Sequence, residues 1–303
     1  MTAALSRRSL LQRIGLVAVA LSRPRWLTAM TGNDPDQERL TSWTTRLRAE
    51  GLDSIDQPFG RSAIRVGELA AGSPYEAGRL DQYLRSGGNA SATEPLTLSL
   101  TRFDCVTLVE SCLAVGRVAG QEGAPTWDRF GRAVERMRYR SGVRHGYASR
   151  LHYFSEWLTD GAARGLVRDL GQEFGAASDA RPLRFMTEHR GSYPALSDDG
   201  VFDEIASIER RLDGQPRWVV PVARIPEVVD RIETGDVLAF ATAIPGLDVT
   251  HTAFACRDGE GTLRVLHAPL SGGTVAVTRT TLPEYVAAIR RATGILIARP
   301  LRG

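Results

Sequence analysis

The chain has 303 residues, of which 43% are hydrophobic and 24% charged, a composition typical of a globular protein with a sizeable core. Its formal net charge of +3, without a long basic run, argues against a nucleic-acid partner. All 38 residues of the Lys and Arg class are arginine, which excludes lysine Schiff-base chemistry, a lysine general base and a P-loop lysine. The three cysteines are too few for a disulfide framework.

The N-terminus has the pattern of a twin-arginine export signal. Arg7 and Arg8 precede an apolar run at 14–21, which is shorter than the roughly 20 residues that a membrane span needs. We therefore expect residues 1–30 to be a signal, and the mature protein to be periplasmic with no stable membrane span. A merely basic, flexible N-terminus is the alternative.

Helices are predicted next along the chain. Asn33 or Asp34 is a suitable cap for a helix that Pro35 opens, and apolar residues recur after it at steps of three and four. A second helix is expected over 61–71, followed by a loop rich in glycine and serine at 87–91. This opening region is predicted to be a helical layer.

A single cysteine stands where a third helix should begin. Residues 95–100 alternate apolar and hydroxyl side chains, the period of a half-buried strand, and helical spacing starts after Asp104, a suitable N-cap. As first helical residue, Cys105 would meet unpaired N–H groups and the positive end of the helix dipole, which favour a thiolate. Taken alone, such a cysteine is more often buried and inert.

Two more helices are expected, over 127–137 and 151–166, on either side of a loop rich in arginine, tyrosine and histidine. Residues 139–157 could form a polar ligand-binding rim, with guanidinium groups for carboxylates and rigid aromatic faces. A solvated connection with buried aromatic residues is an equal alternative. His189, in a second and less dense loop of this kind, is interpreted as a surface or packing residue.

The last third of the chain reads as antiparallel sheet. Strands are predicted at 217–221, 235–242, 251–257, 262–267 and 294–299, and helices at 225–232 and 282–291. Helices therefore come first and strands follow, which predicts an α+β fold.

Two histidines flank a strong hairpin signal at 258–261. If the hairpin is centred on Gly259, His251 and His267 lie directly opposite each other on one face, and this requires an odd-numbered or bulged loop. Together with Cys105 they would supply a nucleophile, a base and a residue that orients the base. The Cys105 sulfur should then lie within hydrogen-bond reach of the His251 ring, or close to it.

These three residues also permit other interpretations. One cysteine and two histidines can also bind catalytic zinc, but the close ligand spacing and the carboxylate base of His-Glu-x-x-His sites are missing. Each histidine alone could be a structural residue of the sheet, with its hydrogen bonds made within the protein. The order of the three favours the catalytic interpretation, with no metal and no cofactor.

Several segments in one order resemble a known family: 103–110, 139–142, 150–157, 185–189, 246–251, 266–269 and 292–300. They are similar to the N-acetylmuramoyl-L-alanine amidase-like branch of the NlpC-type, papain-fold cell-wall cysteine hydrolases. The resemblance implies a papain-like NlpC-type core, in which the catalytic helix packs on an antiparallel sheet, with additional N-terminal and inserted helices. One catalytic domain at 31–303 would comprise a helical part at 31–94, the catalytic helix and insertion at 95–170, and a sheet-rich part at 171–303.

By the same resemblance, Cys105, His251 and His267 are the catalytic residues, and the third is the one whose type varies among relatives. The candidates for substrate binding are Asp104, Arg140, Arg150, His152 and Tyr153. The implied activity is hydrolysis of the amide between muramic acid and L-alanine in muropeptides. The alternatives are an endopeptidase of the same fold that cuts stem peptides, and a non-catalytic module that binds cell-wall fragments.

Overall fold

The computed structural model describes residues 34–270 and 273–303. Asp34–Gly303 form one compact unit. The export signal expected at residues 1–30 lies outside the described residues. The elements of the unit follow the predicted order, with most of the helices before most of the strands.

The helical first half contains α1 (Pro35–Ala49), α2 (Phe59–Leu69), α3 (Gln82–Arg85), α4 (Cys105–Ala119), α5 (Trp127–Arg138) and α6 (Phe154–Ala163). The second half contains β1 (Val167–Asp169), β2 (Ala177–Asp179), α7 (Phe185–Glu188), α8 (Asp199–Leu212), β3 (Arg217–Pro221), α9 (Ile225–Val228), β4 (Val237–Thr242), β5 (Val249–Arg257), β6 (Leu263–His267), β7 (Ala276–Val277), α10 (Leu282–Ala288) and β8 (Ala292–Pro300). Short 3₁₀ turns lie in several of the connections.

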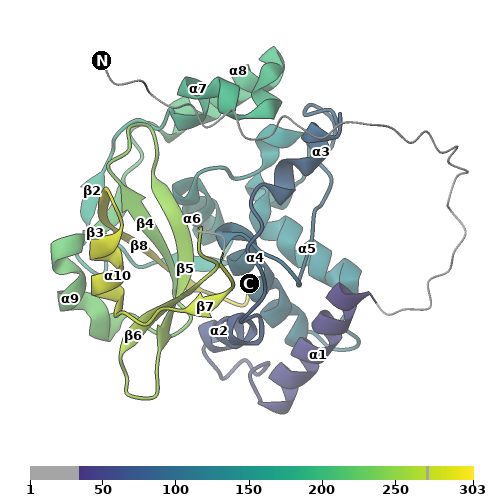
Figure 1. The fold of residues 1–303 in the computed structure, drawn as a ribbon, viewed down its shortest axis with the longest axis vertical. Coiled ribbons are helices and arrows are strands. Elements are labelled where there is room, and N and C mark those ends of the chain that lie inside the picture. The colour runs from purple at the N-terminus through teal and green to yellow at the C-terminus, as the bar shows by residue number, and fades with distance from the viewer. Residues whose placement is uncertain (1–33, 271–272) are drawn as a thin grey trace, which may run out of the picture. The chain divides into compact units, whose positions relative to one another are not determined.

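The strands form one antiparallel sheet in the order β2-β3-β8-β4-β5-β6-β7, and β1 also pairs with β8. In Figure 1, α1, α2, α4 and α5 lie on one side of this sheet, and α9 and α10 lie on the other. The fold is therefore a mixed helix and antiparallel-sheet α+β fold, as predicted.

Each face of the sheet has its own hydrophobic core. Leu113 of α4 belongs to the larger cluster together with Phe254 and Leu296 of the sheet. Phe240 and Ile297 belong to the cluster on the opposite face, together with residues of α9 and α10. Because side chains alternate along a strand, neighbouring residues of β5 enter different cores.

Helix α4 is the central helix of the larger core, and nearly every residue from Leu108 onward is buried. A Cβ atom added at Gly116 would lie 3.0 Å from the ring of Phe59, so the absence of a side chain lets α2 approach α4 closely. The tight packing of α4 fixes the position of its N-terminus, where Cys105 lies.

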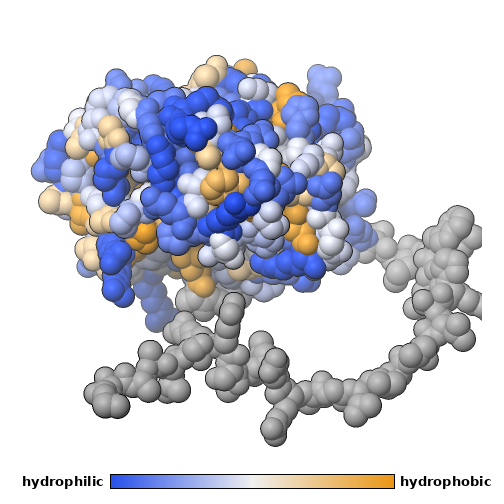
Figure 2. Space-filling model, turned by 90° about the horizontal axis from the view of Figure 1, so that it is seen from above, coloured by the Kyte–Doolittle hydropathy of each residue, from blue (hydrophilic) through white to orange (hydrophobic). Residues whose placement is uncertain are grey.

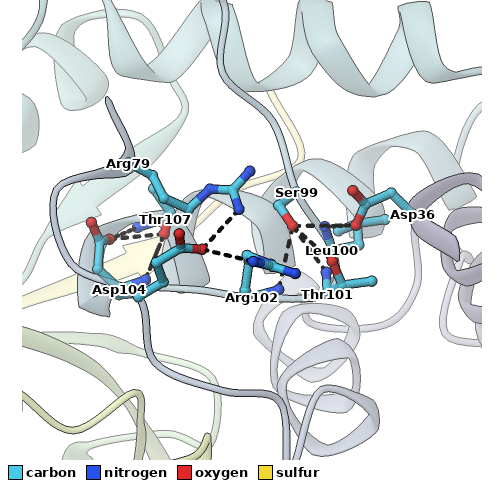
Figure 3. Close-up of polar contacts among 9 residues, drawn as sticks. Asp36, Arg79, Ser99, Leu100, Thr101, Arg102, Asp104 and Thr107 are labelled. Carbon is cyan, nitrogen blue, oxygen red and sulfur yellow. Dashed lines mark hydrogen bonds and ion pairs between the residues drawn. The ribbon is translucent and has the colours of Figure 1, made fainter. Parts of the chain in front are cut away.

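The prediction of a strand over 95–100 is wrong, because this segment pairs with no strand among the residues that the structure describes. Side chains of the surrounding helices satisfy its main chain instead. The Leu100 amide donates to Asp36 at 2.7 Å, the Leu100 carbonyl accepts from Arg39 at 2.8 Å, and the Thr97 carbonyl accepts from Arg138 at 2.7 Å. Figure 3 shows the contacts of Asp36 with Ser99 and Leu100.

Asp36 should therefore contribute measurably to stability. We expect Asp36→Ala to lower the free energy of unfolding by about 1–3 kcal/mol, because the buried Leu100 amide loses its acceptor. Urea denaturation followed by circular dichroism measures this change. Glu38→Ala is the matched control, since Glu38 is an exposed acid in the same first turn of α1. Equal destabilisation by both substitutions would indicate a helix-dipole effect instead.

None of the helices within 34–270 and 273–303 has the length and apolar character of a membrane span. On the face drawn in Figure 2, hydrophilic residues predominate, and hydrophobic residues occur in small separate groups.

Candidate active site

Cys105 is the first residue of α4, as predicted, and Asp104 is its N-cap. The Asp104 carboxylate accepts from the Thr107 amide at 2.8 Å, and the Asp104 amide donates to the Thr107 hydroxyl at 2.9 Å (Figure 3). This capping box uses the carboxylate of Asp104, one of the substrate-binding candidates. It also leaves the Cys105 amide at the positive end of the helix dipole.

The environment of the Cys105 sulfur favours a neutral thiol in the unliganded protein. Burial raises the pKa of Cys105 to about 11, and the charge of Asp104 acts in the same direction. Hydrogen-bonding groups of Thr252, its amide and its hydroxyl, lower this pKa, as does the amide of Val106. Desolvation thus outweighs the helix-dipole effect from which the sequence predicted a thiolate.

The hairpin of β5 and β6 brings the two histidines onto one face of the sheet. Residues 258–262 connect the strands, and this odd number agrees with the predicted condition. The register, however, centres the hairpin on Glu260 and not on Gly259. His267 is therefore a diagonal neighbour of His251, and the directly opposite pairing predicted from the sequence is wrong by two residues.

A short network joins the histidines to Tyr285 of α10. Nε2 of His251 lies 2.9 Å from Nδ1 of His267, and the Tyr285 hydroxyl lies 3.1 Å from the same Nδ1. The His251 ring stacks on Phe240, with 5.8 Å between the ring centroids. Its other nitrogen, Nδ1, is buried and has no hydrogen-bond partner within residues 34–270 and 273–303.

This network can leave a lone pair free on His251. If Nδ1 of His267 accepts from Nε2–H of His251, then Nδ1 of His251 is unprotonated and able to accept a proton. Burial lowers the pKa of His251 to about 3, an effect to which His267 contributes, and burial lowers the pKa of His267 to about 4. Burial, with a smaller effect of Cys105, raises the pKa of Tyr285 to about 12, which keeps its hydroxyl protonated.

Cys105 and His251 line the same cavity, which has a volume of about 160 Å³. Its other lining residues are Val106, Val109, Glu110, Leu151, His152, Phe154, Trp157, Leu247, Asp248, Val249, Thr250 and Thr252. Among the described residues, Nδ1 of His251 has no hydrogen bond, so the tighter of the two expected arrangements, a direct hydrogen bond between the ring and the thiol, is not made in this structure. Catalytic hydrogen bonds often tighten only when substrate binds.

Of the substrate-binding candidates in the arginine-rich loop, only His152 lines this cavity. Its Nε2 lies 3.0 Å from the carbonyl oxygen of Tyr147, an arrangement that requires the proton on Nε2. Burial, followed by the charge of Arg150, lowers the pKa of His152 well below its usual value. The neutral ring therefore has Nδ1 as a hydrogen-bond acceptor.

The two candidate arginines have protein partners elsewhere. Arg150 is buried, donates to Asp81 at 2.6 Å and lies 3.4 Å from Glu94. Arg140 forms a two-pronged ion pair with Glu156, with distances of 2.6 and 3.0 Å. Neither arginine lines the cavity that contains Cys105.

Tyr153 is also away from this cavity. Its hydroxyl donates to Glu209 of α8 at 2.6 Å, in a small separate core. Glu209 is fully buried and accepts a further hydrogen bond from the Met186 amide at 3.2 Å. Tyr153 thus joins α6 to α7 and α8.

Sequence reasoning missed three residues around the site: Thr252, Tyr285 and Trp157. Thr252 directly follows His251, and its amide and hydroxyl lower the pKa of Cys105. The aromatic rings of Phe154 and Trp157 stack on each other, 5.1 Å apart, and form one wall of the cavity. The position of Tyr285 four residues after the Thr281 cap gives no sign that it reaches the histidines.

Within the part of the chain that the structure describes, no three His, Cys, Asp or Glu side chains converge as metal ligands would. The two cavity carboxylates are engaged by protein groups. Glu110 pairs with buried Arg138 at 2.7 Å, and Asp248 accepts from the amide and the hydroxyl of Ser155 at 2.8 and 2.9 Å.

The sequence and the fold are both similar to those of known proteins. A family model described as AmiA-like, N-acetylmuramoyl-L-alanine amidase-like, matches residues 65–295. An N-acetylmuramoyl-L-alanine amidase from Bacteroides uniformis is 27% identical, with a TM-score of 0.73 over 81% of this chain and 100% of that chain. A proposed xylanase from Bacteroides fragilis is 31% identical, with a TM-score of 0.69 over 77% of this chain and 99% of that chain.

A more distant structure shares the fold alone. Protein LPG0564 from Legionella pneumophila is 19% identical, with a TM-score of 0.61 over 88% of this chain and 96% of that chain. No curated protein matches the sequence.

Proposed function

Since the chain belongs to the N-acetylmuramoyl-L-alanine amidase-like family, we propose that it is a cysteine hydrolase of peptidoglycan amide bonds, and that it cleaves the bond between muramic acid and L-alanine in muropeptides. One observation carries this proposal: Cys105 at the start of α4 and the unpartnered Nδ1 of His251 belong to the same cavity. His267 holds the other nitrogen of that ring. These are the parts of a nucleophile, a base and an orienting residue.

The first chemical step is attack of the thiol on the amide carbonyl. The Cys105 sulfur attacks the lactyl carbonyl carbon while Nδ1 of His251 takes the thiol proton. Because burial favours the neutral thiol and the neutral imidazole, this proton moves during the attack and not before substrate binds. The charge then formed on His251 is stabilised through Nε2–H by His267.

The later steps release the two products in turn. The attack turns the carbonyl oxygen into an oxyanion, which the Cys105 amide at the helix start can bind. The carbon–nitrogen bond breaks as Nδ1–H of His251 protonates the leaving amine of the stem peptide, leaving a thioester on Cys105. Water, deprotonated by His251, then cleaves the thioester and releases the free muramic acid carboxylate and the thiol.

The proposal extends to the fold type and to the location of the protein. The packing of α4 on the antiparallel sheet, with its N-terminus at the cavity, supports a papain-like core of the NlpC type. The twin-arginine pattern at Arg7 and Arg8 supports export to the periplasm, where peptidoglycan fragments are available. Replacing both arginines with lysine should block export in cell fractionation.

Mass spectrometry of defined muropeptides incubated with the protein identifies the bond. Release of an intact stem peptide and a free sugar is the expected result. A shortened peptide that is still attached to the sugar would support an endopeptidase, and binding without cleavage would support a non-catalytic module. Xylan oligosaccharides serve as a control substrate, since the cavity carboxylates Glu110 and Asp248 already have protein partners.

Inhibitors test the chemistry of the nucleophile. Iodoacetamide is expected to inactivate the protein by alkylating Cys105, and a chelator is expected to leave its activity unchanged. The reverse pattern would support a zinc site built from the same three residues.

The pH dependence of kcat/KM tests the proposed base. His251 must be neutral to accept the thiol proton, and its pKa is lowered from 6.5 to about 3. A group with a lowered pKa stays neutral down to that value, so kcat/KM should be nearly constant from about pH 7 to about pH 5. An acid limb near pH 6.5 would indicate that a solvated histidine is the base.

The same pKa shifts affect folding, so thermal stability has to be measured at each pH. A histidine whose pKa is lowered in the folded state contributes stability that is complete above its unfolded value, near 6.5. This contribution is lost as the pH falls towards the folded values of about 4 for His267 and about 3 for His251. Rates are therefore compared only where circular dichroism shows folded protein.

A further inference from the structure

Five arginines line a second cavity, of about 330 Å³, at the C-terminal end of α4. They are Arg117, Arg129, Arg132, Arg136 and Arg302. The other lining residues are Gly120, Gln121, Ala133 and Gly303, none of which carries an acidic side chain. Helices α4 and α5, which carry four of the arginines, pack side by side (Figure 1).

Most of this positive charge has no carboxylate partner. Arg132 pairs with Asp128, and no other ion pair involving the five arginines is found among the described residues. Arg117 donates to the carbonyl oxygens of Leu166 and Leu301 at 3.0 and 2.9 Å. Such carbonyl contacts satisfy N–H groups without neutralising the charge.

Arg129 and Arg302 have the same kind of contacts. Arg129 donates to the carbonyl oxygens of Glu122 and Ala124. Arg302 donates through Nη2 to the Leu52 carbonyl at 3.1 Å, while its Nε and Nη1 are buried and have no hydrogen-bond partner in the described part of the chain. Arg136 donates no side-chain hydrogen bond within the described residues.

Capping of the α4 C-terminus explains only part of this cluster. Cations stabilise the negative end of a helix dipole, and Arg48 donates to the Ala119 carbonyl at 3.0 Å in this way. Arg136 and the unpartnered nitrogens of Arg302 make no such contact. The arginines also repel one another: after burial, the charges of Arg136 and Arg164 lower the pKa of Arg117 to about 10.

We propose that this cavity binds a phosphate-type oxyanion. Guanidinium groups match phosphate oxygens in two-pronged hydrogen bonds, and a dianion offsets more of the uncompensated charge than a single carboxylate would. The cavity lies at the opposite end of α4 from Cys105, about 21 Å away along the 15-residue helix, so the site is distinct from the catalytic cavity. The ligand is either a free phosphate compound or the phosphate of a lipid headgroup.

Calorimetric titration of the full chain with pyrophosphate, in a low-salt buffer free of phosphate, tests this site. We expect one pyrophosphate per chain, with affinity about tenfold lower for Arg136→Gln. Arg136→Gln removes no side-chain hydrogen bond that the described residues show, so its melting temperature should not fall. Arg210→Gln is the control of equal charge, since exposed Arg210 of α8 does not line the cavity.

The proposal fails if pyrophosphate does not bind the wild type, or if both substitutions weaken binding equally. Binding of acetate as tight as that of pyrophosphate would also overturn the phosphate preference.

Lipid vesicles identify the source of the phosphate. Sedimentation of the wild type, but not of Arg136→Gln, with phosphatidylglycerol vesicles would indicate a lipid headgroup, whereas pyrophosphate binding without sedimentation would indicate a free phosphate compound.

Discussion

Replacing Cys105 with alanine is expected to lower kcat/KM for muropeptide hydrolysis by about 10⁴-fold or more. The substitution removes the sulfur atom that accepts the acyl group. His251 lies on a strand of the sheet as the proposed base, and it cannot take over the role of acyl acceptor. Substrate binding should change little, because the apolar walls of the cavity, such as Trp157, remain in place. Chromatographic measurement of stem-peptide release at substrate concentrations below KM gives the ratio directly.

Two substitutions make this result specific. Cys105→Ser keeps the size of the side chain but offers a weaker nucleophile, so it should also lose nearly all activity. Cys256→Ala changes a cysteine of β5 that does not line the cavity, and activity per folded molecule should stay within about twofold. Activity of Cys105→Ala within tenfold of wild type would place the nucleophile elsewhere.

The sequence predicted most of the fold where local signals are strong. Asp34 with Pro35, and Asp104 before the cysteine helix, mark helix starts that the structure confirms. Strand β3 begins and ends at the predicted residues. The failure at 95–100 has a clear physical reason, since alternation reports which side chains are buried but not whether a neighbouring strand is present. Here helix side chains take the place of that strand.

The candidate site was predictable where it depends on periodicity. The side-chain period of two, with an odd loop, was sufficient to place His251 and His267 on one face. The exact register of the hairpin could not be predicted in this way, because it depends on Asp258, whose carboxylate accepts hydrogen bonds from the amides of Glu260 and Thr262. Tyr285 reaches His267 from helix α10, a separate element, and one sequence carries no signal of that contact.

The arginines of the polar loop show a different limit. Because the chain has no lysine, arginine also performs the structural tasks that both residue types usually share. Arg150 is buried with two carboxylates, and Arg140 fixes Glu156 of α6, yet both have the sequence context of a ligand-binding rim. In this chain, an arginine without a carboxylate partner, such as Arg136, is the more informative observation.

Replacing His267 with alanine should lower kcat by about 10²–10⁴-fold and leave KM nearly unchanged. Nδ1 of His267 is the only partner of Nε2 of His251 among the described residues. Without it, the ring of His251 can rotate, and part of the population carries its proton on Nδ1, which then cannot accept the thiol proton. Steady-state kinetics with a defined muropeptide separates kcat from KM.

His267→Asn and Tyr285→Phe distinguish this orienting role from simple packing. The amide oxygen of asparagine can occupy nearly the position of Nδ1 and accept from His251, so His267→Asn should be at least about tenfold more active than His267→Ala. Tyr285→Phe keeps the ring contact with Phe240 and removes only the hydroxyl that shares Nδ1 of His267, so its activity should stay within about tenfold of wild type. If the alanine and asparagine variants were equally inactive, His267 would act through packing. If Tyr285→Phe were as inactive as His267→Ala, the tyrosine hydroxyl would be the group that orients His251 through the shared nitrogen.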